Sequence, residues 1–151
     1  MINSKERKKF AMKRVAVVYW SGTGNTEAMA CQIAEGARGA GAETSIFSAE
    51  AFLPQQLENF DAFAFGCPAM GAEELEDTQF EPMFSACEAG LVGRPVALFG
   101  SYGWGDGEWM RLWEDRCAKA GIPLAHESVI CCEAPDDAGA AACRELGKAL
   151  A

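Results

Sequence analysis

Two consecutive segments decide the fold: Val15–Trp20, which reads VAVVYW, and Ser21–Thr26, which reads SGTGNT. The first is almost wholly apolar, as is typical of a strand buried on both faces of a parallel sheet. The second is polar and rich in glycine, and Met29, Ile33 and Ala37 follow it at helical spacing. The chain therefore opens with a strand, a tight loop and a helix, and the positive end of that helix favours an anion.

The rest of the chain repeats this alternation of short apolar runs and segments of helical period. Further strands are expected at residues 44–47, 61–67, 96–100 and 127–132, a short helical turn at 53–60, and helices at 81–89, from Trp109 to Ala120, and from Pro135 to the C-terminus. This pattern predicts an α/β fold, a doubly wound parallel sheet of five strands with helices on both faces. The strand order 2-1-3-4-5 is a common solution, and it places ligands beyond the carboxyl ends of the first, third and fourth strands.

Length and charge narrow the class of protein. A chain of 151 residues is typical of one domain, and residues 1–12 are basic and aperiodic, so we interpret them as an N-terminal extension of a domain at 13–151. The net charge is −9, but residues 1–14 carry +5, which leaves −14 on the remaining 137 residues. So acidic a body argues against nucleic acid and anionic membranes as partners and favours basic proteins.

Composition also argues against membrane, secretory and zinc-binding roles. No apolar run approaches the roughly 20 residues of a membrane span, and no apolar segment follows the basic start as in a signal peptide. The seven cysteines are odd in number and form no Cys-x-x-Cys pair, which indicates buried free thiols in a cytoplasmic protein. His126 is the single histidine, so we expect no zinc site.

The loop Ser21–Thr26 combines flexible glycines, hydroxyl and amide donors and a following helix, which together can bind an anion without a lysine. It is not a Walker motif, and Glu27 replaces the third glycine of a dinucleotide fingerprint. A plain strand-to-helix turn with a threonine or asparagine cap would use the same residues. The density of donors nevertheless favours a phosphate monoester.

Three motifs in this order resemble a known family. Ser21–Thr26 is similar to the FMN phosphate loop of flavodoxins, and Gly66–Gly71 (GCPAMG) and Gly100–Gly107 (GSYGWGDG) resemble the two flavin-ring loops of the short-chain, clostridial-type members. The resemblance covers nearly the whole chain from Met12 onward and implies a flavodoxin-like fold with FMN as cofactor. The cofactor-binding residues that it implies are Ser21, Gly22, Thr23, Gly24, Asn25, Thr26, Pro68, Ala69, Met70, Gly71, Ala72, Glu73, Ser101, Tyr102, Gly103, Trp104, Gly105 and Asp106.

The same resemblance implies roles for some of these residues. Met70 and Trp104 would lie against opposite faces of the flavin ring, which suits an apolar, polarisable surface. The peptide after Gly71 would turn toward the reduced ring, and glycine makes such a turn cheap. Glu73 would accept a hydrogen bond from the ring, although a solvated acid is an alternative. The segment Cys132–Ala134 departs from the family pattern, as does Ala72, and no site residue is assigned to that segment.

The implied function is a low-potential, one-electron carrier that shuttles electrons between redox enzymes. The cofactor supplies the chemistry, and the six acids between Met70 and Gly90, with no basic residue among them, would oppose added negative charge and attract basic partners. We expect a monomer that turns over no substrate of its own. An FMN-dependent quinone reductase on the same fold is the alternative.

A receiver domain of signalling proteins shares the architecture but needs paired acids after the first strand, an aspartate after the third and a lysine after the fifth. Ser21-Gly22, Gly66-Cys67 and Cys132-Glu133 occupy those places, so this class is excluded.

Overall fold

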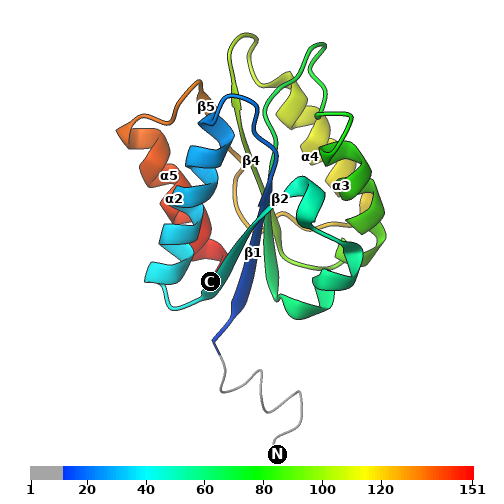
Figure 1. The fold of residues 1–151 in the computed structure, drawn as a ribbon, viewed down its shortest axis with the longest axis vertical. Coiled ribbons are helices and arrows are strands. Elements are labelled where there is room, and N and C mark those ends of the chain that lie inside the picture. The colour runs from blue at the N-terminus through cyan, green and yellow to red at the C-terminus, as the bar shows by residue number, and fades with distance from the viewer. Residues whose placement is uncertain (1–11) are drawn as a thin grey trace, which may run out of the picture.

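The computed structural model describes residues 12–151, so the predicted basic extension lies outside the described residues except for Met12. Its centre is a parallel sheet in the order β2-β1-β3-β4-β5, which confirms the predicted topology (Figure 1). The strands are β1 (Arg14–Tyr19), β2 (Glu43–Ser48), β3 (Ala62–Gly66), β4 (Val96–Tyr102) and β5 (Val129–Cys132).

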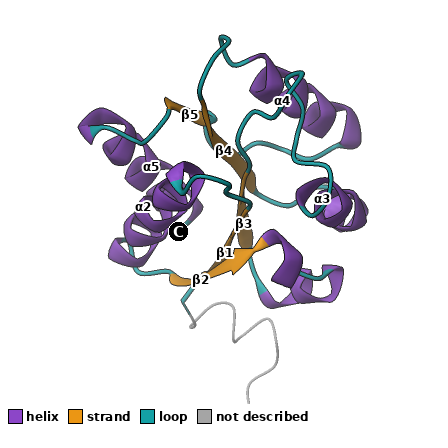
Figure 2. Ribbon diagram, turned by 45° about the horizontal axis from the view of Figure 1, so that its top comes forward, coloured by secondary structure: helices purple, strands orange, loops and turns teal. Residues whose placement is uncertain are grey.

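Helices cover both faces of this sheet, as the alternating pattern predicts. Figure 2 shows α2 and α5 on one face and α3 and α4 on the other. The helices are α2 (Asn25–Gly39), α3 (Phe80–Glu88), α4 (Glu108–Ala120) and α5 (Asp137–Leu150), with short 3₁₀ turns at Ala49–Ala51, Pro54–Asn59 and Ala89–Leu91. No helix in residues 12–151 is long and apolar enough to cross a membrane.

The alternation of side chains along β1 explains why this strand lies at the centre. Val15 and Val17 pack into the core under α2 and α5, whereas Ala16 and Val18 pack into the core under α3 and α4. All four are fully buried. A strand with two apolar faces requires a helical layer on each side, which is the doubly wound arrangement.

Two glycines allow α2 and α5 to approach closely. A Cβ atom on Gly36 would lie 2.1 Å from the carbonyl oxygen of Arg144, and one on Gly147 would lie 2.0 Å from that of Ile33. Since a side chain at either position would meet backbone, only glycine permits this spacing. The contact fixes α2, and with it the loop that precedes this helix.

The observed ends of β4 and β5 differ from the predicted ones. The fourth strand runs to Tyr102 rather than Gly100, because Ser101 and Tyr102 pair with Cys131 and Cys132. The fifth strand begins at Val129 rather than residue 127. Ser101 and Tyr102 were expected in a loop but belong to β4. Their pairing with β5 therefore fixes the position of these two site residues.

Candidate cofactor site

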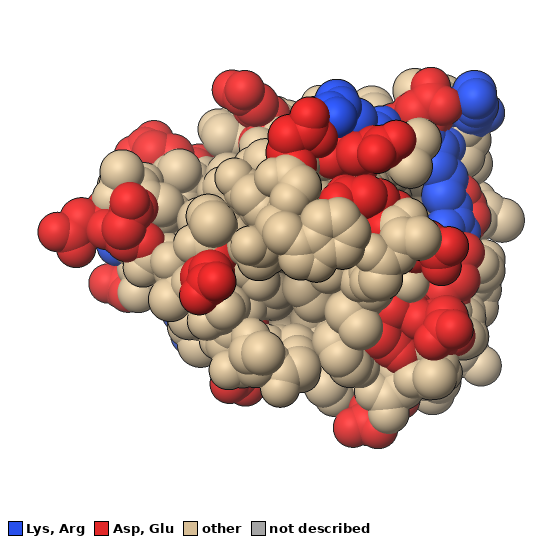
Figure 3. Space-filling model, turned by 90° about the horizontal axis from the view of Figure 1, so that it is seen from above, with Lys and Arg blue, Asp and Glu red and all other residues tan. Residues whose placement is uncertain are grey.

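Three loops meet at the carboxyl edge of the sheet, after β1, β3 and β4 (Figure 1). Between them lies an open cavity of about 350 Å³. It is lined by Trp20, Gly22, Thr23, Asn25, Pro68, Ala69, Met70, Ser101, Tyr102, Gly103 and Glu133. Nine of these eleven residues are on the predicted list, so the structure brings parts of all three motifs to one cavity. Seen from above, acidic side chains surround an uncharged centre (Figure 3).

The first loop ends in an N-terminus suited to an anion. Gly24 has φ 96°, a left-handed conformation that glycine adopts at low cost, and α2 begins at the next residue. The amide of Gly24 donates to the Ser21 hydroxyl over 3.0 Å. Gly24 is the N-cap residue of α2, and no side chain at this position accepts from the amides of the first turn. The positive end of α2 therefore remains available beside Thr23 and Asn25, which line the cavity.

Thr26 has a different place from the rest of this loop. Its side chain is 1% exposed, and its hydroxyl lies 3.1 Å from the hydroxyl of Ser101, which is 5% exposed. The Ser101 amide also donates to Thr26 Oγ1 over 3.4 Å. The pair connects the start of α2 to β4 beneath the cavity, so each hydroxyl satisfies the other.

The second loop folds back on itself at Met70. Met70 and Glu74 exchange two backbone hydrogen bonds of 3.0 Å, which leaves residues 71–73 as a tight turn. Gly71 has φ 42° and Glu73 has φ 60°, both in the left-handed region. The peptide between Gly71 and Ala72 therefore stands at the tip of the turn, where few atoms restrain it.

Glu73 joins the second loop to the third. Its carboxylate accepts a hydrogen bond of 2.8 Å from the backbone amide of Trp109, in the first turn of α4. The other carboxylate oxygen lies against Gly105, where a Cβ would be only 2.5 Å away. Glu73 is half-buried, so the alternative of a fully solvated acid is wrong.

The acidic run between Met70 and Gly90 is less uniform than its sequence indicates. Glu76 is 3% exposed, and its carboxylate accepts hydrogen bonds from Thr78, Gln79 and Phe80 at the start of α3. Burial opposes the charge of Glu76, but these hydrogen bonds outweigh it and lower the pKa of the carboxyl. Glu76 is therefore a buried helix cap rather than a solvated member of the acidic run.

Two more acids of that run share one arginine of α4. Arg116 bonds Glu81 over 2.7 Å and Glu88 over 2.9 Å. The Glu88 bond, the Glu81 bond and both charges raise the pKa of the guanidinium, against its burial. One guanidinium carries a single positive charge, so this cluster keeps a net negative charge of about one. Among residues 12–151, Glu73, Glu74 and Asp77 have no ion-pair partner, and Glu133 lines the cavity itself.

The remaining predicted residues lie outside the cavity wall. Trp104 is 67% exposed, and Asp106 pairs with Arg111 over 2.9 Å, which lowers the pKa of the aspartate. Ser21 and Gly24 line a neighbouring hollow of about 300 Å³ on the β2 side. Trp109 and Trp113 are core residues, as their helical spacing predicts.

Sequence reasoning missed two residues of the cavity wall. Trp20 lines both hollows, and its indole donates to the Gln79 side chain over 3.0 Å. Glu133 follows β5, has φ 60° and donates its amide to the Tyr102 carbonyl over 2.8 Å. Each is the first residue beyond a strand at the same sheet edge, and that position was the available signal.

Comparison with known proteins decides the family. The family model described as Flavodoxin matches residues 17–147. The chain belongs to the flavodoxin family. It is 45% identical to a flavodoxin of Megasphaera elsdenii over 91% of this chain and 98% of that one, and 43% identical to a flavodoxin of Clostridium beijerinckii over 89% and 97%. The solution structure of the two-electron reduced Megasphaera elsdenii flavodoxin matches with a TM-score of 0.83 and 46% identity, over 90% of this chain and 97% of that one.

As a flavodoxin, the protein is an electron carrier that binds FMN and exchanges electrons with redox partners. The cavity is compatible with this cofactor, since α2 begins beside it without a side-chain cap and Pro68, Ala69 and Met70 add apolar surface to its lining. The quinone reductase alternative is not favoured.

Proposed function

We propose that the three loops hold FMN without a covalent bond, with its phosphate at the first loop. The convergence of all three loops on one cavity carries this assignment. Backbone amides at the start of α2 and the side chains of Thr23 and Asn25 would donate hydrogen bonds to the phosphate, and the helix dipole would favour its charge. Thr26 and Ser101 would support this loop from below rather than touch the phosphate.

The second and third loops would hold the ring. Met70, half-buried on the cavity wall, would contact one face, and the exposed Trp104, flanked by Gly103 and Gly105, would close over the other. Glu73 holds these loops together through Trp109, and one of its oxygens would accept a hydrogen bond from the ring. The peptide after Gly71 would turn to donate to the ring.

Bound FMN supplies the redox chemistry, taking up and releasing electrons one at a time. The charges of Glu73, Glu74 and Asp77 would oppose added negative charge and so keep the potential low. Those charges and the net charge of −9 would attract basic surfaces of redox enzymes. We further propose a cytoplasmic monomer with no substrate of its own.

A titration of the apoprotein with FMN and with riboflavin tests the phosphate assignment. FMN should bind much more tightly, because riboflavin lacks the group that the first loop is proposed to hold. Equal affinities would show that Ser21–Thr26 is only a turn.

The visible spectrum during stepwise anaerobic reduction tests the one-electron proposal. A one-electron-reduced flavin should accumulate, and a steady-state assay with a nicotinamide donor and a quinone should show no turnover. Direct passage to the fully reduced flavin, with quinone turnover, would favour the reductase.

A further inference from the structure

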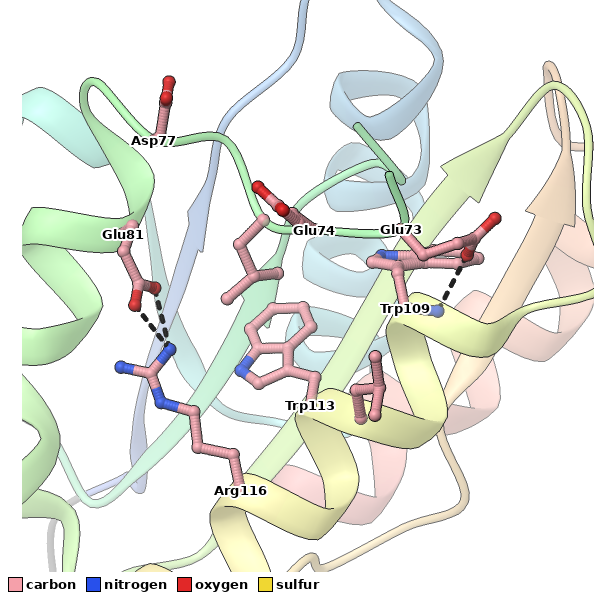
Figure 4. A pocket seen from close by; sticks show the side chains of 9 residues that line it. Glu73, Glu74, Asp77, Glu81, Trp109, Trp113 and Arg116 are labelled. Carbon is pink, nitrogen blue, oxygen red and sulfur yellow. Dashed lines mark hydrogen bonds and ion pairs between the residues drawn. The ribbon is translucent and has the colours of Figure 1, made fainter. Parts of the chain in front are cut away.

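A separate groove lies beside the cofactor cavity, between residues 73–77 and helices α3 and α4 (Figure 4). Its volume is about 300 Å³. The indoles of Trp109 and Trp113 form its floor, and each is 2% exposed or less. Leu75 and Leu112 add apolar surface, and Leu112 is 55% exposed. We refer to this hollow as the α3–α4 groove.

The rim of the α3–α4 groove carries unneutralised negative charge. Of its four carboxylates, Glu81 is paired with Arg116, and Glu73 accepts from the Trp109 amide. Glu74 and Asp77 are exposed, and within residues 12–151 neither has an ion-pair partner. Both project from the loop above the groove (Figure 4). A cation placed between them would gain attraction from both.

The floor of the groove carries an unused donor. Among residues 12–151, the indole nitrogen of Trp113 is the one buried side-chain nitrogen or oxygen without a hydrogen-bond partner. It lies on the side of the ring that faces Arg116 (Figure 4). An indole N–H can only donate, and leaving such a donor unsatisfied costs about 1–3 kcal/mol. An incoming group that supplies an acceptor oxygen would recover part of that cost.

The charge around this donor selects the kind of acceptor. Carboxylate or phosphate oxygens would be repelled by Glu74 and Asp77, whereas a neutral peptide carbonyl would not. A peptide can also present a lysine or arginine beside its carbonyl, with an aliphatic stem that packs on apolar surface. Leu112 offers such a surface, because it lines the groove and is exposed.

We propose that the α3–α4 groove binds an extended basic segment of a redox partner protein. A backbone carbonyl of that segment accepts from Trp113, a lysine or arginine pairs with Glu74 and Asp77, and its stem packs on Leu75 and Leu112. The segment thereby anchors the partner next to the cofactor loops, because Glu73 lines the groove and its carboxylate also lies against Gly105 of the third loop. This inference rests on the proposed exchange of electrons with basic partners.

Calorimetric titration of the FMN-loaded protein with a short acetylated and amidated peptide of alternating lysine and leucine tests the groove. The double variant Glu74→Gln/Asp77→Asn should weaken binding roughly tenfold or more, since two charge-assisted contacts are lost. The variant Glu35→Gln/Glu58→Gln removes the same net charge from exposed acids elsewhere and should weaken binding only slightly. Equal losses in the two variants would overturn the proposal.

The variant Trp113→Phe tests the carbonyl contact. It removes the N–H but keeps an aromatic ring against Phe80 and Phe84, which lie edge-on to Trp113. Peptide binding should weaken several-fold, by the value of one hydrogen bond. Unchanged affinity would mean that those ring faces already satisfy the N–H, and the proposal would fail.

FMN affinity is measured on every variant and should match the wild type. In Glu74→Gln/Asp77→Asn the flavin should be easier to reduce fully, because two charges that oppose added negative charge are removed. Loss of peptide binding with intact FMN binding therefore locates the effect in the groove. Failure of the wild type to bind FMN would overturn the proposed cofactor site instead, while peptide binding to the wild type with no response to the groove variants would overturn the groove alone.

Discussion

Thr23 and Thr26 are identical residues of one loop, but one faces the cofactor cavity and the other supports the loop from the core. Thr23 is exposed at the cavity, whereas the Thr26 hydroxyl is buried against Ser101. A hydrogen bond to a charged group contributes about 1.5–3 kcal/mol. Thr23→Ala should therefore weaken FMN binding by roughly 10- to 100-fold with little change in thermal stability. Thr26→Ala should lower stability as well, because it leaves Ser101 without its buried partner.

Fluorescence titration with FMN and thermal melts of both apoproteins measure these effects. Arg38→Ala and Arg94→Ala are the controls, because their guanidinium groups donate to backbone carbonyls of Thr44 and Phe60, away from the cavity. If either arginine variant releases FMN, the phosphate is held by a distant charge and the loop assignment is wrong.

Gly71 is the residue where backbone freedom matters most to the flavin. Its φ is 42°, and no atom lies within 4 Å of a Cβ built there, so a side chain meets strain rather than a clash. Gly71→Val should hinder the turn of the following peptide and reduce the one-electron-reduced flavin that accumulates during anaerobic reduction. Gly71→Ala, with a smaller side chain, should show less of the effect. Unchanged spectra in both variants would show that the turn of this peptide does not stabilise the one-electron-reduced flavin.

At the scale of elements, the sequence was sufficient for the sheet because burial leaves a local pattern. Val15–Val18 reads as a strand with two apolar faces, and the indoles of Trp109 and Trp113 mark the buried side of α4. The ends of elements were less predictable. Tyr102 joins β4 only because β5 lies beside it, and that pairing has no local signal.

The positions of the site loops could be predicted from the sequence, but the partners of the acidic residues could not. The glycine-rich loops stood out because few residues accept their conformations. Glu73 and Trp109 are 36 residues apart in the sequence, and Arg116 and Glu81 are 35 apart. Because contacts at such separations leave no local pattern, the acidic run alone did not predict them. Glu76, one of the six acids expected to oppose added negative charge, also caps α3, and no local pattern marked that second role.

The contact between α2 and α5 yields a prediction about stability. Gly36→Ala and Gly147→Ala would each place a Cβ about 2 Å from a backbone carbonyl oxygen. Alanine gains about 1 kcal/mol over glycine in a helix interior, but overpacking against backbone costs about 1–3 kcal/mol or more. Both variants should therefore lower the urea midpoint. Gly39→Ala is the matched control, since nothing lies within 4 Å of its Cβ and the midpoint should hold or rise. Equal midpoints for all three would show that the helices separate freely.

At the scale of the whole molecule, the burial of several cysteine thiols makes the free energy of unfolding depend on pH. Burial raises the pKa of Cys67 and Cys143 from 9.0 to about 12 and of Cys87 and Cys117 to about 11. All four are fully buried. In the unfolded chain these thiols lose their protons near pH 9, while in the folded protein they keep them. The unfolded state then binds fewer protons, so stability falls as the pH rises.

Each such thiol lowers the free energy of unfolding by about 1.4 kcal/mol per pH unit above pH 9, and four together would remove about 5 kcal/mol per unit. A domain that starts with roughly 5–15 kcal/mol should therefore unfold before its thiols reach their folded-state pKa values. Urea unfolding between pH 7 and about pH 10 measures the slope. Cys87→Ala/Cys117→Ala should roughly halve it, even though the cavities lower stability at pH 7. Cys31→Ala, at an exposed position on α2, should leave the slope unchanged. A slope that is the same in all three proteins would mean that the alkaline lability arises from the acidic surface rather than from the buried thiols.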